Sequence, residues 1–568
     1  MRLVECVPNF SEGRDMSVID AITNEIKSVK DVQLLDVDPG ADTNRTVVTF
    51  VGTPEMVGEA AFKAVKKASE LIDMSKHKGA HARMGATDVC PFIPVSGVTM
   101  QECVQISKRV GERVAKELNI PVYFYEFSAN CEERKNLANI RQGEYECLPE
   151  KLKDPKWKPD CGDACFNSKA GVTVMGARQF LIAYNINLNT KDKKLAHEIA
   201  LNIREAGRSK KDAEGNIIRD DNGKAIKVPG IFKGLKAVGW YIDEYKQAQV
   251  SMNITDHHET PVHIIFDEVC NQAEKLGLRV TGSELVGLIP KDAMIDAGVH
   301  YLSKQGKSTG IPEEDIILTA IQSLGLEDIS EFDPKKKVIE YRLTEDAKKD
   351  RQFLRYMTLR GFANELSTDS PAPGGGSVAA LSASMGSALS SMVANLTIGK
   401  KGYEKVTEKM KEIAVSGQKL KDEFLLLIDE DTDAFSEVMA AMKLPKKSDE
   451  DKKIRQKAIE DANKYAAEIP LKVLEKTTEI FPLAKEVAQS GNQNSLSDSG
   501  VAAICAQAAA RSAYYNVIIN LQSIEDKKFV EETRKKADQL LDKAYGMYKE
   551  VRGIVDKALG LEQAVGAK

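Results

Sequence analysis

The feature that most constrains the fold of this chain is a six-segment pattern of strands and helices that occurs twice before residue 291. In both copies, alternating and helical hydrophobic periods follow one another as strand, helix, strand, strand, helix, strand. The first copy covers residues 2–10, 17–29, 32–38, 45–52, 54–72 and 88–95. The second covers residues 178–189, 192–207, 235–244, 248–256, 261–277 and 279–290.

This repeated βαββαβ order predicts two ferredoxin-like α/β subdomains, the first over residues 1–178 and the second over residues 179–327. A further helix at 100–118 and a strand at 121–127 extend the first subdomain. We expect the two sheets to face one another across a cleft or tunnel. The polar insertion KKDAEGNIIRDDNGKAIK has EG and NG turn signals and is expected to form an exposed hairpin or loop.

After residue 348 the pattern changes to long segments rich in Ala, Leu, Lys and Glu with helical periodicity. Residues 348–568 are therefore predicted to form an all-α helical bundle, which makes the chain multidomain. A linker is expected at residues 328–347. Pro470 and Gly500 are expected to break or start helices in the bundle.

The composition is ordinary for a soluble globular chain. Hydrophobic residues make up 42% and charged residues 29%, and the net charge of −5 gives no electrostatic case for nucleic acid. The nine cysteines form no CxxC pair, which favours reduced thiols in the cytoplasm over a disulfide framework or a zinc site. No secretion signal is recognisable in MRLVECVPNF, so a cytoplasmic location is expected.

One segment, residues 370–398, has no charged side chain and is long enough to cross a membrane. It is rich in Ser, Ala and Gly instead of Leu, Ile and Phe. We therefore expect close helix packing, inside a bundle or at a subunit interface, and no membrane span.

Two histidines four residues apart occupy the stretch HKGAHARMG. Because each glycine disfavours a helix by about 1 kcal/mol relative to alanine, a loop is expected around His77 and His81. A loop histidine can exchange a proton with a nucleophile and a leaving group, and the alternative is a surface or hydrogen-bonded histidine. Zinc is disfavoured, since a third ligand is missing. His257 and His258 are interpreted mainly as surface residues.

Two loops of the first half are rich in Gly, Asp, Asn and Arg and lie at strand ends. Such loops often bind ligands, but turns use the same residue types for backbone reasons, and both alternatives stay open. The second loop is CGDACFNSKAGVTVMGAR, residues 161–178. The first, LLDVDPGADTNRT, contains Asp36, Asp38, Asp42, Asn44 and Arg45.

The helical half contains three polar stretches in apolar surroundings. Glycines 374–376 precede a helix, where free amides suit a carboxylate or phosphate, although a close helix crossing needs small residues too. The missing GK[ST] ending disfavours a nucleotide P-loop. The run DEDTD either holds a carboxylate of raised pKa or forms a solvated face. Further polar side chains need partners, which a ligand can provide; these are Asn492, Asn494, Asp498, Asn516 and Asn520.

Several long motifs together resemble one family. VECVPNFSEGRD, LLDVDPGADTNRTVVTFVG, LIDMSKHKGAHARMGATDVCPFIPV, QFLIAYNIN and SELVGLIP are similar to the glutamate formiminotransferase domain. SPAPGGGSVAA, DEDTDAF and GNQNSLSD are similar to formiminotetrahydrofolate cyclodeaminase. Over essentially the whole chain, their order resembles that of the bifunctional formimidoyltransferase-cyclodeaminase family.

The resemblance implies a bifunctional transferase and ammonia lyase of histidine degradation and one-carbon metabolism. The first activity transfers the formimino group of N-formiminoglutamate to N5 of tetrahydrofolate. The second cyclises 5-formiminotetrahydrofolate to 5,10-methenyltetrahydrofolate and releases ammonia. Tetrahydrofolate, expected in polyglutamylated form, is the acceptor substrate, and no metal is implied. The resemblance also implies a homo-oligomer. The net charge and the composition, as described above, favour neither nucleic acid nor a membrane as partner.

The resemblance further implies roles for single residues. His81 would be the catalytic base that takes the N5 proton, with Asp38 as an orienting or charge-stabilising partner. Asp431, the middle acid of DEDTD, would handle protons in the cyclodeaminase. Folate-binding residues of the transferase map onto Gly162, Asn167, Gly171, Gly176 and Arg178. Substrate-binding residues expected in the cyclodeaminase are Gly374, Gly375, Gly376, Asp498 and Asn516.

Two other functions are compatible with these residues. One is a formyltransferase that prefers N-formylglutamate, which the attached cyclodeaminase argues against because ammonia release needs a formimino adduct. The other is a folate-binding structural oligomer, which the presence of both His81 and Asp431 disfavours. Lys400 and Lys401 are candidates for holding an anionic folate tail, with a solvated charge run as the alternative.

Overall fold

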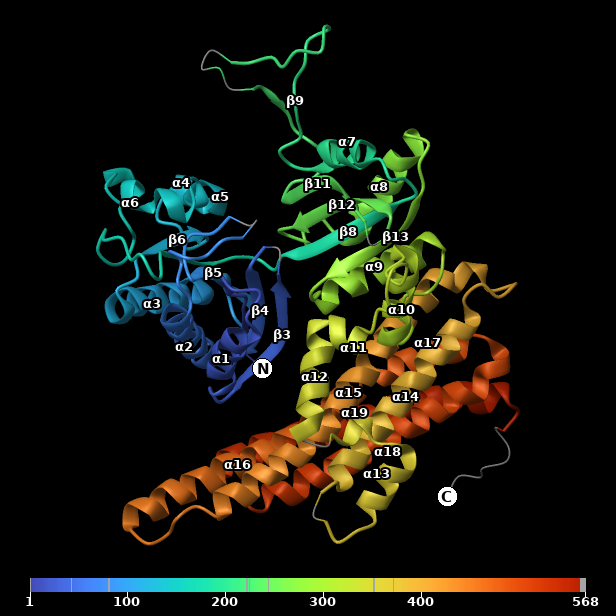
Figure 1. The fold of residues 1–568 in the computed structure, drawn as a ribbon. Coiled ribbons are helices and arrows are strands. Elements are labelled where there is room, and N and C mark those ends of the chain that lie inside the picture. The colour runs from blue at the N-terminus through green and yellow to red at the C-terminus, as the bar shows by residue number, and fades with distance from the viewer. Residues whose placement is uncertain are drawn as a thin grey trace. The chain divides into compact units, whose positions relative to one another are not determined.

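The computed structural model describes residues 2–41, 43–79, 82–220, 223, 225–243, 245–350, 353–370 and 372–561 (Figure 1). Two of the sequence-predicted residues, Asp42 and His81, lie outside the described residues. The chain forms two compact units. The first unit comprises Met1–Ala293 and Gly325–Arg342, and the second comprises Met294–Leu324 and Leu343–Lys568.

The first unit begins with a seven-stranded sheet formed by β1 (Leu3–Cys6), β2 (Asn9–Phe10), β3 (Val32–Gly40), β4 (Arg45–Gly52), β5 (Thr87–Ser96), β6 (Val122–Glu126) and β7 (Thr173–Ala177). Both β1 and β2 pair with β4 on one side and β5 on the other, so they act as one interrupted strand. β3 pairs antiparallel with β4 at the edge. β7 and β6 continue the sheet beyond β5 in parallel.

Amphipathic helices cover one face of this sheet, as Figure 1 shows; they are α1 (Met16–Lys27), α2 (Met56–Leu71) and α3 (Met100–Leu118). The core on this face contains Val4 and Cys6 of β1 and Phe50 of β4, all fully buried. α3 begins with a capping box between Thr99 and Glu102, which satisfies free backbone amides of the first turn. Because side chains alternate along a strand, the residues between these core positions face the opposite side.

The second sheet has four antiparallel strands in the spatial order β11-β12-β8-β13. Its elements are β8 (Ile182–Leu188), α7 (Lys193–Ile203), β11 (Leu235–Ile242), β12 (Gln247–Ile254), α8 (Val262–Lys275) and β13 (Val280–Val286). The small paired strands β9 (Arg208–Ser209) and β10 (Lys227–Val228) flank the predicted polar insertion, residues 210–227. The prediction of two α/β domains followed by a helical region is confirmed.

Short helices connect β6 to β7, namely α4 (Glu132–Lys135), α5 (Leu137–Arg141) and α6 (Leu148–Lys151). Five 3-10 turns complete the described secondary structure: η1 (Tyr145–Cys147), η2 (Pro155–Trp157), η3 (Leu354–Tyr356), η4 (Glu404–Val406) and η5 (Gln493–Ser495). Of these segments, α5 contributes a charged side chain, Arg141, to the cavity described below.

Helices dominate the remainder: α9 (Lys291–Lys304), α10 (Glu313–Leu324), α11 (Pro334–Lys337), α12 (Ile339–Asp350), α13 (Leu359–Leu366), α14 (Gly375–Thr397), α15 (Thr407–Met442), α16 (Asp449–Thr477), α17 (Ile480–Ser490), α18 (Leu496–Leu521) and α19 (Lys527–Ala558). The segment predicted as linker, residues 328–347, contains α11 and most of α12. The α9–α10 loop belongs to the second unit, where the Gly310 carbonyl accepts a 2.7 Å hydrogen bond from Asn395 Nδ2.

α14, the uncharged helix, packs between α15 and α18 through small side chains. A Cβ atom at Gly386 would lie 2.9 Å from the Ala502 carbonyl oxygen, and one at Gly417 of α15 would lie 2.8 Å from the Ser391 Cβ. α14 is long and apolar enough to cross a membrane by length and composition, but 61% of its apolar window is buried within the protein. Close helix packing therefore accounts for its composition.

Pro470 and Gly500 neither break nor start helices, which corrects the sequence prediction. Pro470 lies inside α16, and Gly500 lies inside α18. Proline removes the amide that would bond the Ala466 carbonyl, and Asn520 Nδ2 donates to that carbonyl instead, at 2.6 Å. A side chain from a neighbouring helix thus replaces the missing backbone bond. At Gly500, a Cβ would lie 3.1 Å from a Val555 methyl group, so this glycine permits a close crossing with α19.

Candidate active sites

A cavity of about 400 Å³ lies against the helix-free face of the first sheet. Alternation along β1 and β2 brings Glu5, Val7 and Asn9 into its wall, while Val4 and Cys6 point to the helices. The second sheet contributes residues from β8, β12 and the end of β13, so the cavity lies between the two α/β domains. Its charged lining residues are Glu5, Asp36, Asp38, Arg45, Arg141 and Arg178.

One buried aspartate holds two of these arginines. Asp88, which has no exposed surface, forms ion pairs with Arg45 and, at 2.5 Å, with Arg141. Burial alone would raise the pKa of Asp88, but the two guanidinium groups outweigh burial and hold it below its usual value. Arg45 also donates to Asn9 Oδ1 at 2.8 Å. Two fixed arginines against one carboxylate leave one positive charge in excess, which suits an anionic ligand.

Arg141 has a donor that no described residue uses. Its Nε atom is buried and lacks a hydrogen-bond partner among the described residues, although its Nη2 bonds Asp88. A buried donor without a partner costs about 1–3 kcal/mol, so such a group is explained best by a ligand that completes it.

The acidic side of the cavity comes from β1 and β3. Burial, with a smaller contribution from the neighbouring Asp38, raises the pKa of Asp36. Burial raises the pKa of Glu5 to about 7. The predicted residue Asp38 has an exposed side chain and lines the cavity, as does the predicted residue Arg178. The cavity therefore brings opposite charges together around one space.

His77 is a structural residue of its loop. Its Nδ1 accepts a hydrogen bond from Arg83 Nε at 3.2 Å, and its Nε2 lies 2.8 Å from the Asn44 carbonyl. One nitrogen accepts and the other must donate, so the ring is neutral, and burial lowers the pKa of His77. Arg83 in turn pairs with Glu144 and Glu146. These contacts favour the hydrogen-bonded alternative for this histidine.

The assignment of His81 stays a prediction, since the described residues resume at Ala82. Ala82 lines a hollow of about 740 Å³. This hollow and the cavity between the sheets have Leu137, Arg141, Leu181 and Asn253 in common. The chain thus reaches the rim of the charged cavity one residue after His81.

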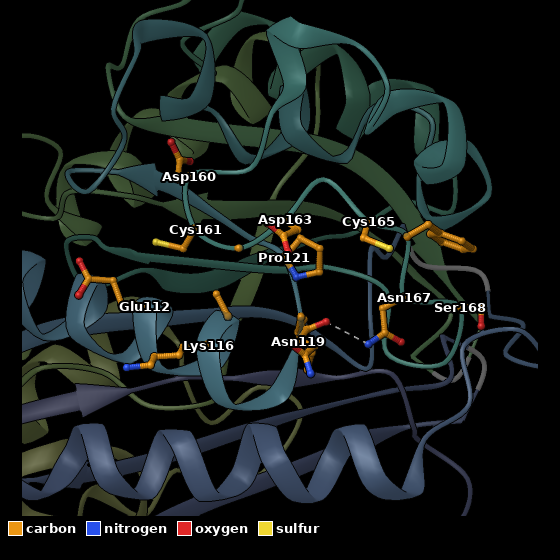
Figure 2. Close-up of a pocket in the computed structure, with 14 residues that line it drawn as sticks. Glu112, Lys116, Asn119, Pro121, Asp160, Cys161, Asp163, Cys165, Asn167 and Ser168 are labelled. Atoms are coloured by element: carbon orange, nitrogen blue, oxygen red, sulfur yellow. Dashed lines mark hydrogen bonds between the residues drawn. The ribbon is translucent and has the colours of Figure 1, made fainter.

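The residues predicted to bind folate in the transferase do not lie together. Gly162 and Asn167 line an open pocket of about 1010 Å³ beside the end of α3 (Figure 2). There Asn167 Nδ2 donates to the Asn119 carbonyl at 3.3 Å. Arg178, in contrast, lines the cavity between the sheets.

Gly171 and Gly176 line neither space and have backbone roles. A Cβ atom at Gly171 would lie 2.3 Å from the Met84 carbonyl oxygen, and Gly171 has a φ of +67°. A Cβ atom at Gly176 would lie 2.5 Å from the Tyr125 carbonyl oxygen. Only glycine permits these close approaches, so turn and strand packing explain both residues.

In the helical unit, Asp431 of α15 faces the start of α14. Its Oδ2 accepts a 2.9 Å hydrogen bond from Ser377 Oγ, and the Ser377 backbone amide also donates to it. A Cβ atom at Gly376 would lie 2.0 Å from Asp431 Oδ1, so any side chain there would displace the Asp431 carboxylate. Burial raises the pKa of Asp431 more than the Ser377 bonds lower it. The anion expected at this helix start is therefore the protein's own carboxylate.

Asn516 joins this group, whereas Asp498 does not. A Cβ atom at Gly375 would lie 3.1 Å from Asn516 Nδ2, which itself donates to the Ser512 carbonyl at 2.8 Å. Gly374 is the N-cap residue of α14. Asp498 lies in the first turn of α18, and at a rise of about 1.5 Å per residue it is about 27 Å along the helix from Asn516.

Three other polar side chains of the helical half have structural partners. Asp429 is buried and accepts bonds from the Leu354 amide at 2.7 Å and from Arg355 at 2.6 Å. Glu430 pairs with Lys472 at 3.1 Å. Lys400 donates to Asn492 Oδ1 at 2.6 Å. This contact favours neither of the two alternatives for Lys400, binding of an anionic folate tail or membership of a solvated charge run.

The interpretation of His257 as a surface residue is wrong, because it is 6% exposed; His258 is exposed. The Nε2 atoms of His257 and His258 lie 3.2 and 3.8 Å from the carboxylate of Asp292. Among the described residues these three groups have the spacing of metal ligands. The hydrogen bond between His257 and Asp292 lowers the pKa of Asp292 and accounts for the arrangement by itself.

Sequence reasoning missed Glu5 and Arg141. A glutamate in the middle of the apolar strand segment LVEC is a recognisable signal, since a buried charged residue needs an explanation. Arg141 ends a short helix with no distinctive pattern, and only the fold brings it to Asp88.

The fold and these sites define an enzyme with two separate centres, one in an α/β unit and one in a helical unit. Family models match the chain as the formiminotransferase domain, N-terminal subdomain, at residues 3–178, and the formiminotransferase domain at residues 183–344. The formiminotransferase-cyclodeaminase model matches residues 358–539. The chain belongs to the formiminotransferase-cyclodeaminase family.

Relatives match the whole chain or either half. The formimidoyltransferase-cyclodeaminase of Mus musculus is 45% identical over 544 residues, which are 96% of this chain and 97% of the relative. The glutamate formimidoyltransferase of Streptococcus pyogenes is 44% identical over 301 residues, 53% of this chain and 93% of the relative. The methenyltetrahydrofolate cyclohydrolase of Methylorubrum extorquens is 42% identical over 187 residues, 33% of this chain and 90% of the relative.

Proposed function

We propose that this chain is a bifunctional glutamate formimidoyltransferase and formimidoyltetrahydrofolate cyclodeaminase. It transfers the formimino group of N-formiminoglutamate to N5 of tetrahydrofolate and then cyclises the product to 5,10-methenyltetrahydrofolate with release of ammonia. The single observation that carries this proposal is the 45% identity to a relative of that name along 97% of its length. The charged cavity and the Asp431 cluster add a chemically suitable site in each unit.

The transfer step needs a base for N5 and an acid for the departing amine. As N5 attacks, a bond forms to the formimino carbon and the N5 proton is lost; the carbon–nitrogen bond to glutamate then breaks and that nitrogen gains a proton. We assign this relay to His81, because a histidine side chain can both accept and donate a proton near neutral pH. Arg45 and Arg141 supply positive charge for substrate carboxylates, and Asp38 borders the same cavity.

The cyclodeaminase step consumes one proton. N10 attacks the formimino carbon of 5-formiminotetrahydrofolate, its proton passes to the former imino nitrogen, and loss of ammonia requires one proton more. Burial raises the pKa of Asp431, so its protonated form persists to higher pH than that of a solvated aspartate. We assign to Asp431 the protonation of the leaving nitrogen, with Gly375, Gly376 and Asn516 shaping the space around it.

Tetrahydrofolate is the one-carbon acceptor substrate in this proposal, in polyglutamylated form, and neither step is assigned a metal. The binding set proposed from the sequence for folate in the transferase is Gly162, Asn167, Gly171, Gly176 and Arg178, and Asp498 remains a proposed contact of the cyclodeaminase. The open pocket beside α3 supports Gly162 and Asn167, and the cavity supports Arg178. We place the enzyme in the cytoplasm and in histidine degradation.

The finer organisation is also proposed. Two ferredoxin-like subdomains occupy residues 1–178 and 179–327, followed by a linker at 328–347 and the cyclodeaminase domain at 348–568. The strand order β3-β4-β1-β5 matches β11-β12-β8-β13, which supports a common plan. A homo-oligomer is proposed because α14 and α18 carry exposed apolar side chains, namely Met385, Met392, Leu396, Val501, Ile504 and Ile519.

A paired assay of methenyltetrahydrofolate absorbance and ammonia tests both activities. Wild type supplied with N-formiminoglutamate and tetrahydrofolate should form both products. His81→Ala should form neither, and Asp431→Asn should accumulate 5-formiminotetrahydrofolate. Faster turnover of N-formylglutamate would favour the formyltransferase alternative, and folate binding without turnover would favour the structural oligomer.

A further inference from the structure

Glu5 is held in place at the centre of the first sheet. Its backbone pairs with Val51 of β4 and with Ile93 of β5, and its chain neighbours Val4 and Cys6 belong to the core under the helices. The Glu5 side chain therefore belongs to the opposite face, where it lines the charged cavity. The pairing on both sides therefore fixes the Glu5 backbone and the face of the sheet that its side chain occupies.

One oxygen atom of the Glu5 carboxyl group, Oε2, is buried and has no hydrogen-bond partner among the described residues. Glu5 as a whole is 1% exposed. Burying a carboxyl group without a partner is costly, and burial raises the pKa of Glu5 to about 7. Arg178 favours the ionised form, whereas Glu340 of α12 disfavours it. A donor brought by the substrate would complete this acceptor.

The two candidate donors differ at one atom. N-Formiminoglutamate carries a nitrogen with N–H donors where N-formylglutamate carries an oxygen with lone pairs alone. In its ionised form, the Glu5 carboxylate accepts a charge-assisted hydrogen bond from the imino nitrogen of N-formiminoglutamate. The same carboxylate and the formyl oxygen of N-formylglutamate are both acceptors, so no hydrogen bond forms between them. A site whose buried polar group is left unpaired by an analogue rejects that analogue strongly.

We propose that Glu5 determines donor specificity, with its unpartnered oxygen accepting a hydrogen bond from the imino nitrogen of the formimino group. This inference rests on the proposed transferase function. Glu5 makes no covalent bond: the new bond to N5 forms and the bond to glutamate breaks while the imino nitrogen keeps its place on the carboxylate. The excess positive charge of Arg45, Asp88 and Arg141 is left for the carboxylates of glutamate.

The test compares kcat/KM for the two donors in the full-length enzyme. Wild type should prefer N-formiminoglutamate by about 100-fold or more, as expected for loss of a charged hydrogen bond in a buried site. Glu5→Gln should reduce that preference at least tenfold, because its amide group can donate to the formyl oxygen. Glu102→Gln, which removes a carboxylate from the capping box of α3 on the other face, is the matched control and should keep the wild-type ratio.

An equal loss of rate with both donors in folded Glu5→Gln would overturn the inference, since a purely structural residue affects both alike. If Glu5→Gln does not fold, inhibition of wild type decides the question. Formamidinium should then inhibit transfer at least tenfold more strongly than formamide, and equal inhibition would overturn the inference. If wild type uses neither donor, the proposed transferase function itself is wrong. If wild type turns over both donors at equal rates, the transferase function stands and only the inference about Glu5 is wrong.

Discussion

The Asp431 carboxylate packs so closely against Gly376 that a Cβ atom at position 376 would lie 2.0 Å from Asp431 Oδ1. The contact joins the acidic run of α15 to the glycine-rich start of α14, two motifs separated by more than fifty residues of sequence. It explains why this helix begins with glycine and why its first amides have an anion to bind.

Gly376→Ala should displace the Asp431 carboxylate and reduce cyclodeaminase kcat by about 100-fold, the lower range for loss of an aligned acid or base. Transferase activity, measured from formation of 5-formiminotetrahydrofolate, should stay within about twofold. Gly546→Ala in α19 is the control, because a Cβ atom there meets nothing within 4 Å. Full cyclodeaminase activity in Gly376→Ala would contradict the assignment of Asp431.

The cyclodeaminase rate should fall as pH rises through the pKa of Asp431, because the protonated carboxyl group is the active form and burial raises its pKa. The same sign applies to stability: a carboxyl group with a raised pKa in the folded state stabilises the fold at low pH, and that contribution is lost as pH rises. Asp431→Asn should therefore raise Tm at pH 7.5 by about 2–4 °C. Scanning calorimetry and a pH–rate profile measure the two effects. A cyclodeaminase rate that does not fall as pH rises would contradict the role of Asp431 as the acid.

Asn520→Ala should destabilise the helical unit by about 1–3 kcal/mol, because it leaves the Ala466 carbonyl beside Pro470 without a donor. Pro470→Ala restores the backbone amide, so the loss caused by Asn520→Ala should be smaller in the double variant. Urea unfolding of all four proteins gives the coupling energy. Strict additivity would show that the side chain does not replace the missing backbone bond.

Arg141→Met should raise KM for N-formiminoglutamate by about 10- to 100-fold, the effect of removing one charged hydrogen bond. Cyclodeaminase activity on supplied 5-formiminotetrahydrofolate should not change. The control is Arg219→Met in the exposed insertion. Among the described residues, the Arg219 side chain donates to one acceptor, the Gly223 carbonyl oxygen. A KM equal to that of wild type would place the substrate carboxylates elsewhere.

Ile504→Asp should dissociate the proposed homo-oligomer, since Ile504 of α18 is 54% exposed in an apolar surface. Light scattering after size-exclusion chromatography measures the mass. Ile217→Asp in the polar insertion removes a similarly exposed isoleucine, at 44%, and should leave the mass unchanged. A monomeric wild type would contradict the proposal directly.

Local sequence patterns predict the repeated strand and helix order and the change to helices after residue 348, and they contain the motifs that resemble one family. Hydrophobic periodicity is local, so an α/β region and a helical region are recognisable without coordinates. The acidic run DEDTD and the glycines of α14 were also identified from local patterns, since each is unusual among its own neighbours. The choice of Asp431 within that run came from the family resemblance.

Tertiary structure alone decided which of these residues meet. It separated Gly162 from Arg178, and it joined Arg141 to Asp88 across 53 residues of sequence. It also let α16 continue through Pro470, because Asn520 comes from another helix to bond the free carbonyl. Contacts of this kind depend on packing between distant segments, and neither propensity nor periodicity encodes them.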